Sequence, residues 1–350
     1  MPEAIKKRDV KWDNVKFILI FLVVLGHIAD IYAEVSFATG CLRFIIYTFH
    51  MPLFMFISGL FGKRNVDEKR YDKIFSFLVL YLFVKVLDFI AKWIVNGAKP
   101  AFHLFSDGSV PWYAFCLFAF SMLIIALKRV DKKYVFIFSI LLALVAGYDN
   151  DIGDFLCLSR IIVFFPFYFA GYCLDPDKVK EKLSAKKMKI ASVIIIAAAI
   201  AVTILCYDEI KDMKFLFSGR NPFGRVKPGY PLSFLLRLVC YAVSALMGCA
   251  VISLTPGGEK ESVFSRVGAR SLQIYALHFF FKTLWFGLVS DPLHIDGFFT
   301  SKLLVYELIV SVALTALCAL PFWSGMFKKI LKVPYRKGGE KDNLQIGGSV

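Results

Sequence analysis

Apolar stretches long enough to cross a lipid bilayer recur about ten times along this sequence. Because lipid offers no water to backbone N–H and C=O groups, such a segment folds as an α-helix that satisfies them internally. Of the 350 residues, 58% are hydrophobic, more than one soluble core could bury. The sequence therefore predicts an all-α, polytopic membrane protein. The expected spans are residues 15–33, 44–61, 74–95, 111–127, 134–147, 160–174, 190–206, 231–254, 271–289 and 303–323.

Lysine and arginine gather in alternate connections between these spans. With the N-terminus inside, the inner connections and tails hold 28 of the 42 basic residues, and the outer connections hold eight. Cytoplasmic loops of membrane proteins carry this excess. The asymmetry predicts ten helices with both termini in the cytoplasm, in the cell membrane. The net charge of +15 then reflects topology and contact with anionic lipid, and nucleic acid is not an expected partner.

The connections leave no room for a separate soluble domain. We expect one membrane domain over residues 1–327 and a basic, disordered tail over 328–350. The outer loop 207–230 is rich in Gly, Pro and charge, and either holds a ligand or is a solvated re-entrant connection. The eight cysteines have no C-x-x-C spacing and are expected as small core residues. Cys41 and Cys157 both fall at the outer face, so a disulfide between them is the alternative.

A histidine interrupts the first span. His27 follows Lys16 by eleven residues, about 16 Å along a helix and roughly half the hydrocarbon thickness. A cation at the inner surface and a titratable ring near the midplane therefore lie on one element. Intramembrane ionisable residues usually mark a path, a relay or a site. The alternative is a histidine that hydrogen-bonds a neighbouring helix for packing alone.

Two further histidines, His50 and His278, reach a similar depth on the second and ninth spans. Three rings at one depth indicate a shared site, in which a neutral imidazole accepts a hydroxyl proton as a general base. Zinc is the competing interpretation. The spacings match no zinc motif and no Asp or Glu is identified near the histidines in the sequence, so no metal is predicted.

Arg160 and Arg237 lie in or at the ends of apolar spans and have no obvious partner close by in the sequence. A buried cation needs compensation. The expected source of the compensating negative charge is an anionic ligand or an interhelical carboxylate such as Glu307 or Asp30.

Five segments of the sequence resemble the membrane-bound acyltransferase 3 family. The N-terminal RDVKWDNVKFILIFLVVLGH contains that family's motif of an Arg or Lys, ten residues and a His, here Lys16 and His27. The details H-M-P and F-P-F-x-x-A-G-Y look closest to the fucose 4-O-acetylase-like acetyltransferases. The other four matching segments are FHMPLFMFISG at 49–59, PWYAF at 111–115, SRIIVFFPFYFAGY at 159–172 and GARSLQIYALH at 268–278, so the resemblance spans nearly the whole chain.

The resemblance implies transfer of an acyl group, commonly acetyl, from cytoplasmic acyl-CoA to a hydroxyl of a cell-surface or lipid-linked sugar. Acyl-CoA is then a substrate, and no permanently bound cofactor is expected. His27 acts as base or transient acyl carrier, and His278 and His50 complete the catalytic group. The residues expected to bind the donor are Lys16, Arg8, Lys63 and Arg64, and those expected at the acceptor or oxyanion are Arg160, Trp112, Ser58, Tyr275 and Arg220.

Two other function classes remain open. A transporter for a glycolipid or polysaccharide precursor would use the histidines as a proton relay. A ligand-sensing membrane domain with decayed catalysis is disfavoured by the intact spacing between Lys16 and His27. The acceptor sugar and the oligomeric state are not determined by the sequence.

Overall fold

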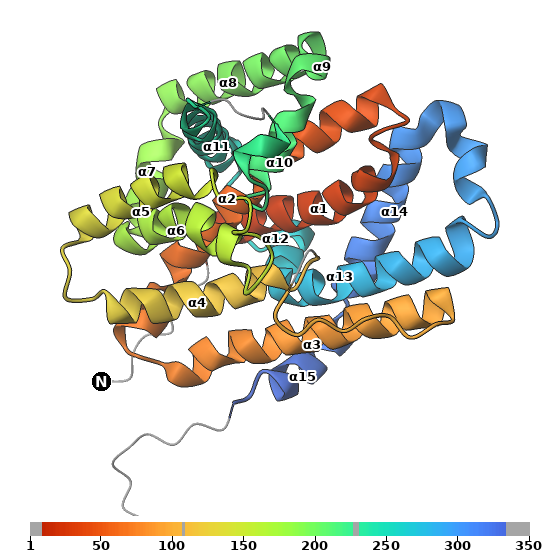
Figure 1. Cartoon of the computed structure of the whole chain (residues 1–350), viewed down its shortest axis with the longest axis horizontal. Helices are drawn as coiled ribbons and strands as arrows, with labels where there is room; N and C mark the ends of the chain where they lie inside the picture. Colours follow the sequence, from red (N-terminus) through yellow and green to blue (C-terminus); the bar gives the residue numbers. More distant parts are fainter. Residues whose placement is uncertain (1–8, 107–108, 227–230, 334–350) are drawn as a thin grey trace, which may run out of the picture.

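The computed structural model describes residues 9–106, 109–226 and 231–333, and this part of the chain is helical without β-strands. Figure 1 shows α1, α3 and α13 running side by side in the bundle. The longer helices are α1 (Val10–Tyr32), α2 (Phe37–Asp67), α3 (Tyr71–Asn96), α4 (Trp112–Ala126), α5 (Lys132–Ala146), α6 (Leu158–Cys173), α8 (Lys186–Leu205), α11 (Phe234–Leu254), α13 (Ser271–Trp285) and α14 (Leu303–Cys318). The shorter elements are α7 (Pro176–Ser184), α9 (Tyr207–Ile210), η1 (Lys211–Met213), α10 (Lys214–Phe217), η2 (Phe223–Arg225), α12 (Val263–Gly268), the π-turn η3 (Phe286–Ser290), η4 (Ile295–Lys302) and α15 (Pro321–Ile330).

Each of the ten expected spans falls on a helix, but fewer helices are long enough to cross a membrane alone. Six of the described helices pass that test: α1, α2, α3, α8, α11 and α13 extended through η3. Two bent pairs, α6 with α7 at 93° and α14 with α15 at 58°, raise the number to eight. The remaining two, α4 and α5, have 15 residues each, about 22 Å of helix. The structure therefore supports a multi-pass protein with six to eight full spans.

The first helix lies at the centre of the bundle. Its N-cap is Asp9, whose side chain accepts a hydrogen bond from the Lys11 backbone N–H at 2.9 Å. Val15, Leu19 and Ile20 are completely buried, and α1 packs against α2, α12, α13 and α14. A helix that is apolar on nearly every side is stable only where other helices or lipid surround it. This central position lets α1 present one face to an internal cavity.

Glycines permit a close crossing between α2 and α6, which have the most extensive contact of any helix pair. A Cβ atom at Gly59 would overlap the Tyr168 carbonyl, and one at Gly171 would overlap the Phe56 carbonyl. The two backbones therefore touch at this point. Small residues at such crossings are typical of membrane helices, where packing rather than water drives association.

The connection after α3 folds back along that helix instead of staying at its end. The Tyr81 hydroxyl donates to the Leu104 carbonyl at 2.6 Å, and Lys85 Nζ donates to the Ser106 carbonyl at 3.2 Å. Ser106 also forms an isolated β-bridge with Phe155 in the next connection on that side. As a result α4 begins inside the bundle, which explains why it is short.

All eight cysteines are free thiols, and Cys41 and Cys157 lie in separate hydrophobic clusters, so the structure forms no disulfide between them. Helix α15 continues through Ile330, past the expected domain boundary at residue 327. Residues 334–350 of the expected tail lie outside the described residues.

Candidate active site

A cavity of about 1120 Å³ follows α1 through the bundle. Helix α1 contributes Lys16, Ile20, Val23, His27 and Asp30 to its wall. These positions alternate in steps of four and three residues, so they form one stripe along the helix. From Lys16 to Asp30 the stripe extends about 21 Å. The cavity therefore connects the depth of Lys16 with that of His27 and continues beyond it.

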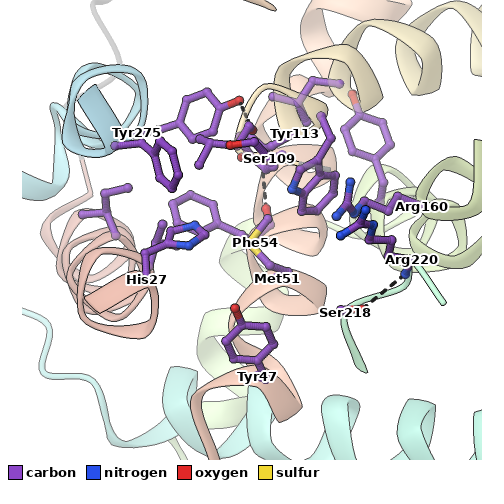
Figure 2. A pocket seen from close by; sticks show the side chains of 18 of the residues that line it. His27, Tyr47, Met51, Phe54, Ser109, Tyr113, Arg160, Ser218, Arg220 and Tyr275 are labelled. Carbon is purple, nitrogen blue, oxygen red and sulfur yellow. Dashed lines mark hydrogen bonds between the residues drawn. The ribbon is translucent and has the colours of Figure 1, made fainter. Parts of the chain in front are cut away.

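The imidazole of His27 faces this cavity, as Figure 2 shows. Its Nδ1 lies 3.7 Å from Oδ2 of Asp30, one helical turn further along α1. Its ring stacks against His278, with 5.4 Å between ring centroids, and meets the edge of Phe279 at 5.6 Å. The ring is thus held between a carboxylate and two rings of α13.

Asp30 is the functional residue that the sequence reasoning missed. The interpretation that no Asp or Glu lies near the histidines in the sequence is wrong, because Asp30 follows His27 by three residues, and that spacing was the available signal. The Tyr47 hydroxyl donates to Asp30 Oδ2 at 2.6 Å, and Arg43 Nη1 lies 3.9 Å from Oδ1. Tyr47 and Asp30 both line the cavity. A cation and a hydroxyl from α2 therefore keep the carboxylate in place beside His27.

His278 is fully buried and lies directly behind His27. Its Nδ1 is 2.8 Å from the Tyr275 carbonyl and 3.1 Å from the Ile274 carbonyl. Carbonyl oxygens only accept hydrogen bonds, so Nδ1 carries a proton. Nε2 is buried and has no hydrogen-bond partner among the described residues. In the neutral ring this nitrogen is an acceptor.

His50 does not join the other two rings at the cavity. Its Nδ1 contacts the Ile46 carbonyl at 2.7 Å, its ring centroid is 5.1 Å from that of Tyr47, and it is not among the lining residues. The structure therefore brings together two of the three predicted histidines and places the third next to Tyr47. Across the described ranges, no three His, Cys, Asp or Glu side chains are arranged so that they could hold a metal ion.

The Lys16 end of the cavity includes polar residues from several helices. Lys16 lies 3.5 Å from Asp13 and 4.5 Å from the centre of the Phe61 ring. Asn65 on α2 and Ser271 on α13 line the same end. Of the other predicted donor-binding residues, Lys63 and Arg64 are absent from the lining, Arg64 pairs with Glu68 at 2.8 Å, and Arg8 lies outside the described residues.

Ser58 and Tyr275 line the cavity, but their hydroxyl groups also hold its wall together. Ser58 Oγ donates to the Phe54 carbonyl at 2.8 Å and lies 2.7 Å from the Tyr113 hydroxyl. The Tyr275 hydroxyl donates to the Val110 carbonyl at 2.8 Å, which fixes the start of α4. Neither hydroxyl contacts His27. Both residues therefore shape the cavity around the ring.

Arginines occupy the opposite end, beyond His27. Arg220 Nε lies 2.8 Å and 2.9 Å from the two carboxylate oxygens of Asp154, and Arg160 Nη1 lies 3.8 Å from Oδ1 of the same residue. The guanidinium of Arg160 also lies 4.7 Å from the centre of a Trp112 ring, and Phe164 stacks on that indole. The carboxylate beside Arg160 is thus Asp154, six residues earlier in the chain and in the connection before α6, so the expectation of no partner close by in the sequence is wrong.

The two carboxylates suggested as partners for Arg160 and Arg237 were wrong. Glu307 accepts a hydrogen bond from Thr39 at 2.7 Å, and Asp30 lies 3.7 Å from Nδ1 of His27. Arg237 donates to the Leu216 carbonyl and lies 5.5 Å from the centre of the Phe223 ring. A backbone carbonyl and an aromatic face therefore compensate this buried guanidinium in part, and its Nε and Nη2 atoms have no hydrogen-bond partner among the described residues.

The loop expected over residues 207–230 forms part of this end of the cavity. Its described residues in the wall are Lys214, Phe215, Ser218, Arg220, Asn221, Pro222 and Arg225. Residues 227–230 of the loop lie outside the described residues. Of the two interpretations left open, the ligand-holding one fits this placement.

Comparison with known proteins gives one family and one curated relative. The model of the family Acyl_transf_3, described as an acyltransferase domain, matches residues 9–323. The nodulation protein NolL of Sinorhizobium fredii is 36% identical over 97 residues. That match covers 27% of this chain and 26% of NolL, so it spans about a quarter of the relative. No solved structure gives a significant match.

Proposed function

The chain belongs to the acyltransferase 3 family, and we propose that it is an O-acetyltransferase of the cell membrane that acetylates a sugar hydroxyl. The family match over residues 9–323 establishes the enzyme class. The proposal adds the donor, cytoplasmic acetyl-CoA, and the acceptor, a cell-surface or lipid-linked sugar. It also adds the fucose 4-O-acetylase-like subgroup, which the H-M-P sequence at 50–52 and the F-P-F-x-x-A-G-Y sequence at 165–172 favour.

The observation that carries this proposal is the single cavity that contains Lys16, His27 and Arg160 in its wall. An acyl transfer between a cytoplasmic donor and an acceptor on the other side needs one base that both substrates reach. The stripe on α1 supplies that base between two polar ends. A cation at Lys16 suits the phosphates of acyl-CoA, and the thioester then reaches toward His27.

The distribution of basic residues supports the orientation. With both termini in the cytoplasm and ten crossings, Lys16 lies at the inner surface and Arg160 toward the outer surface. Ten crossings require α4 and α5 to span as well. The connection that folds back along α3 makes a short α4 compatible with this, because the loop covers the remaining depth.

His27 is proposed as the general base. Its Nδ1 faces Asp30, so Nε2 is the nitrogen that meets the acceptor. Nε2 accepts the hydroxyl proton, the acceptor oxygen bonds to the thioester carbonyl carbon, and the carbon–sulfur bond breaks. The proton passes to the departing sulfur, so that CoA leaves as a thiol. Asp30 stabilises the charge that the ring carries between these two proton transfers.

Acetyl transfer from labelled acetyl-CoA by the protein in lipid nanodiscs tests this role. His27→Ala should reduce the rate by at least about 100-fold, the usual contribution of a general base. His103→Ala is the matched control, because His103 is exposed and lies outside the cavity wall. Both variants are first shown to insert and to elute as folded protein. Retained turnover in His27→Ala would exclude the role, and substrate flux without acetyl-CoA consumption would favour a transporter.

A further inference from the structure

The wall of the cavity carries more positive than negative charge. Two carboxylates, Asp30 and Asp154, line it together with seven cationic side chains: Lys16, Lys92, Arg160, Lys214, Arg220, Arg225 and Lys282. Four of the seven, Arg160, Lys214, Arg220 and Arg225, lie at the end beyond His27: Arg160 and Arg220 share Asp154, and Lys214 and Arg225 lie against Phe215 of the loop that carries Arg220. We call these four residues the distal basic cluster.

The carboxylates near the distal basic cluster are already shared. Both oxygens of Asp154 bind Arg220, and Arg160 lies 3.8 Å from one of them. Glu34 binds Lys214 at 3.1 Å and also Arg43 at 3.1 Å. Asp154 and Glu34 are therefore each shared by two cations, and the distal basic cluster keeps a net positive charge.

Arg225 adds to this excess. Its guanidinium lies 4.7 Å from the centre of the Phe215 ring and makes no ion pair with a described residue. Arg160 lies against Trp112 in the same way. A guanidinium that stacks on an aromatic ring lies parallel to that ring, so its N–H groups point away from the stack. Two of these N–H groups together can donate to two oxygens of a carboxylate or phosphate.

The distal basic cluster combines buried and accessible charge. Arg160 is only 6% exposed and shares Asp154 with Arg220, whereas Arg220 and Arg225 are exposed at the cavity wall. A ligand with a negative group would give Arg225 an ion-pair partner and add a counter-charge beside Arg160. A neutral sugar would cover these guanidinium groups without adding negative charge.

We propose that the acceptor is anionic, and that the distal basic cluster binds a carboxylate or phosphate on the sugar while the hydroxyl to be acetylated reaches His27. The inference rests on the proposed function and names the substrate class of the same site. Figure 2 shows His27 on one side of the space and Arg160 with Arg220 on the other. An acceptor held at both ends has its reacting hydroxyl oriented before the thioester arrives.

Binding to the His27→Ala protein in nanodiscs tests the proposal without turnover. Isothermal titration compares glucuronate with its neutral amide, glucuronamide, and glucose 1-phosphate with glucose. We expect at least one anion to bind about tenfold or more tightly than its neutral partner, with an affinity that falls as salt is added. The first pair reports a carboxylate site and the second a phosphate site. Equal affinities within both pairs, or no binding of either anion, would overturn the proposal.

Variants locate the binding to the cluster. Arg225→Gln and Arg220→Gln should each weaken the preferred anion about tenfold and leave its neutral partner unchanged. Lys211→Gln is the matched control, because Lys211 pairs with Asp208 in the same loop and is not in the cavity wall. Equal effects of the three substitutions would indicate that the overall positive charge of the loop attracts the anion and that the distal basic cluster is not its binding site.

The failure of this proposal differs from the failure of the proposed function. Acetyl transfer by the wild-type protein is measured separately, with matched neutral and anionic acceptors. Equal kcat/KM for the two acceptors would refute the anionic acceptor and leave the acetyltransferase intact. Anion binding at the cluster without any His27-dependent acetyl transfer would refute the acetyltransferase and leave the anion site intact.

Discussion

The carboxylate of Asp30 lies one helical turn beyond the imidazole of His27, with 3.7 Å between Asp30 Oδ2 and His27 Nδ1. The same oxygen accepts a hydrogen bond from the Tyr47 hydroxyl at 2.6 Å. A carboxylate on the Nδ1 side leaves Nε2 for proton transfer. The arrangement places a base and its orienting acid on a single helix, and Tyr47 and Arg43 of α2 hold the carboxylate beside the ring.

Replacing Asp30 by Asn should lower kcat by about 10 to 100-fold, because an amide keeps the shape but not the charge that supports a protonated His27. The KM for acetyl-CoA should change little, since Lys16 and the residues around it are untouched. Steady-state kinetics in nanodiscs separate the two constants. Tyr47→Phe removes one hydrogen bond to Asp30 and should cost less than Asp30→Asn. Wild-type kcat in Asp30→Asn would contradict this role.

Replacing Lys16 by Ala should raise the KM for acetyl-CoA about tenfold and make it less sensitive to salt, because one cation that binds phosphate is lost. Lys63→Ala is a suitable comparison, since Lys63 lies toward the same end of α2 but outside the cavity wall. Titrating acetyl-CoA at two salt concentrations gives both values. Equal increases in KM for the two variants would indicate that donor binding depends on the whole basic surface.

Replacing Gly59 by Ala should destabilise the fold by about 1–3 kcal/mol, because the new Cβ would overlap the backbone of α6 and force the helices apart. Gly258→Ala is the control, since no heavy atom lies within 4 Å of a Cβ built there. Thermal unfolding followed by circular dichroism compares the two variants with wild type. A melting temperature for Gly59→Ala that matches Gly258→Ala would show that the crossing is looser than described.

The connection between α1 and α2 should weaken in acid. Hydrogen bonds from Lys214 and then from Arg43 hold the pKa of Glu34 below its ordinary value of 4.5. A carboxyl group whose pKa is depressed by folding stabilises the fold above pH 4.5 and loses that contribution as the pH falls through its folded pKa. The melting temperature of Glu34→Gln should therefore be below wild type at pH 7 and approach it below pH 4. Because Glu34 is largely exposed, high salt should reduce the difference.

Much of the helical architecture was predictable from hydropathy. The centre of every expected span lies in a helix, because apolar segments of that length have no other stable form in lipid. The number of full crossings was not predictable in the same way. Helix α4 is short because residues 97–106 fold back along α3, and that path depends on the hydrogen bonds of Tyr81 and Lys85.

Part of the site was also predictable from the sequence. The separation of Lys16 and His27, and the stripe that ends at Asp30, follow from helical periodicity along one segment. His278 was predicted to share a site with His27, and the structure stacks the two rings. His50 was predicted at the same depth too, but depth does not determine the rotation of a helix, and its ring lies outside the cavity wall.

The sequence by itself determined the family, the helical membrane class and the position of His27 relative to Lys16, because each depends on residues close together in one segment. Only the tertiary structure decided that Tyr47 and Arg43 hold Asp30, and that Asp154 is shared between Arg160 and Arg220. These contacts join different helices and loops. They depend on how each helix is rotated and how closely the backbones approach, and hydropathy carries no information about either.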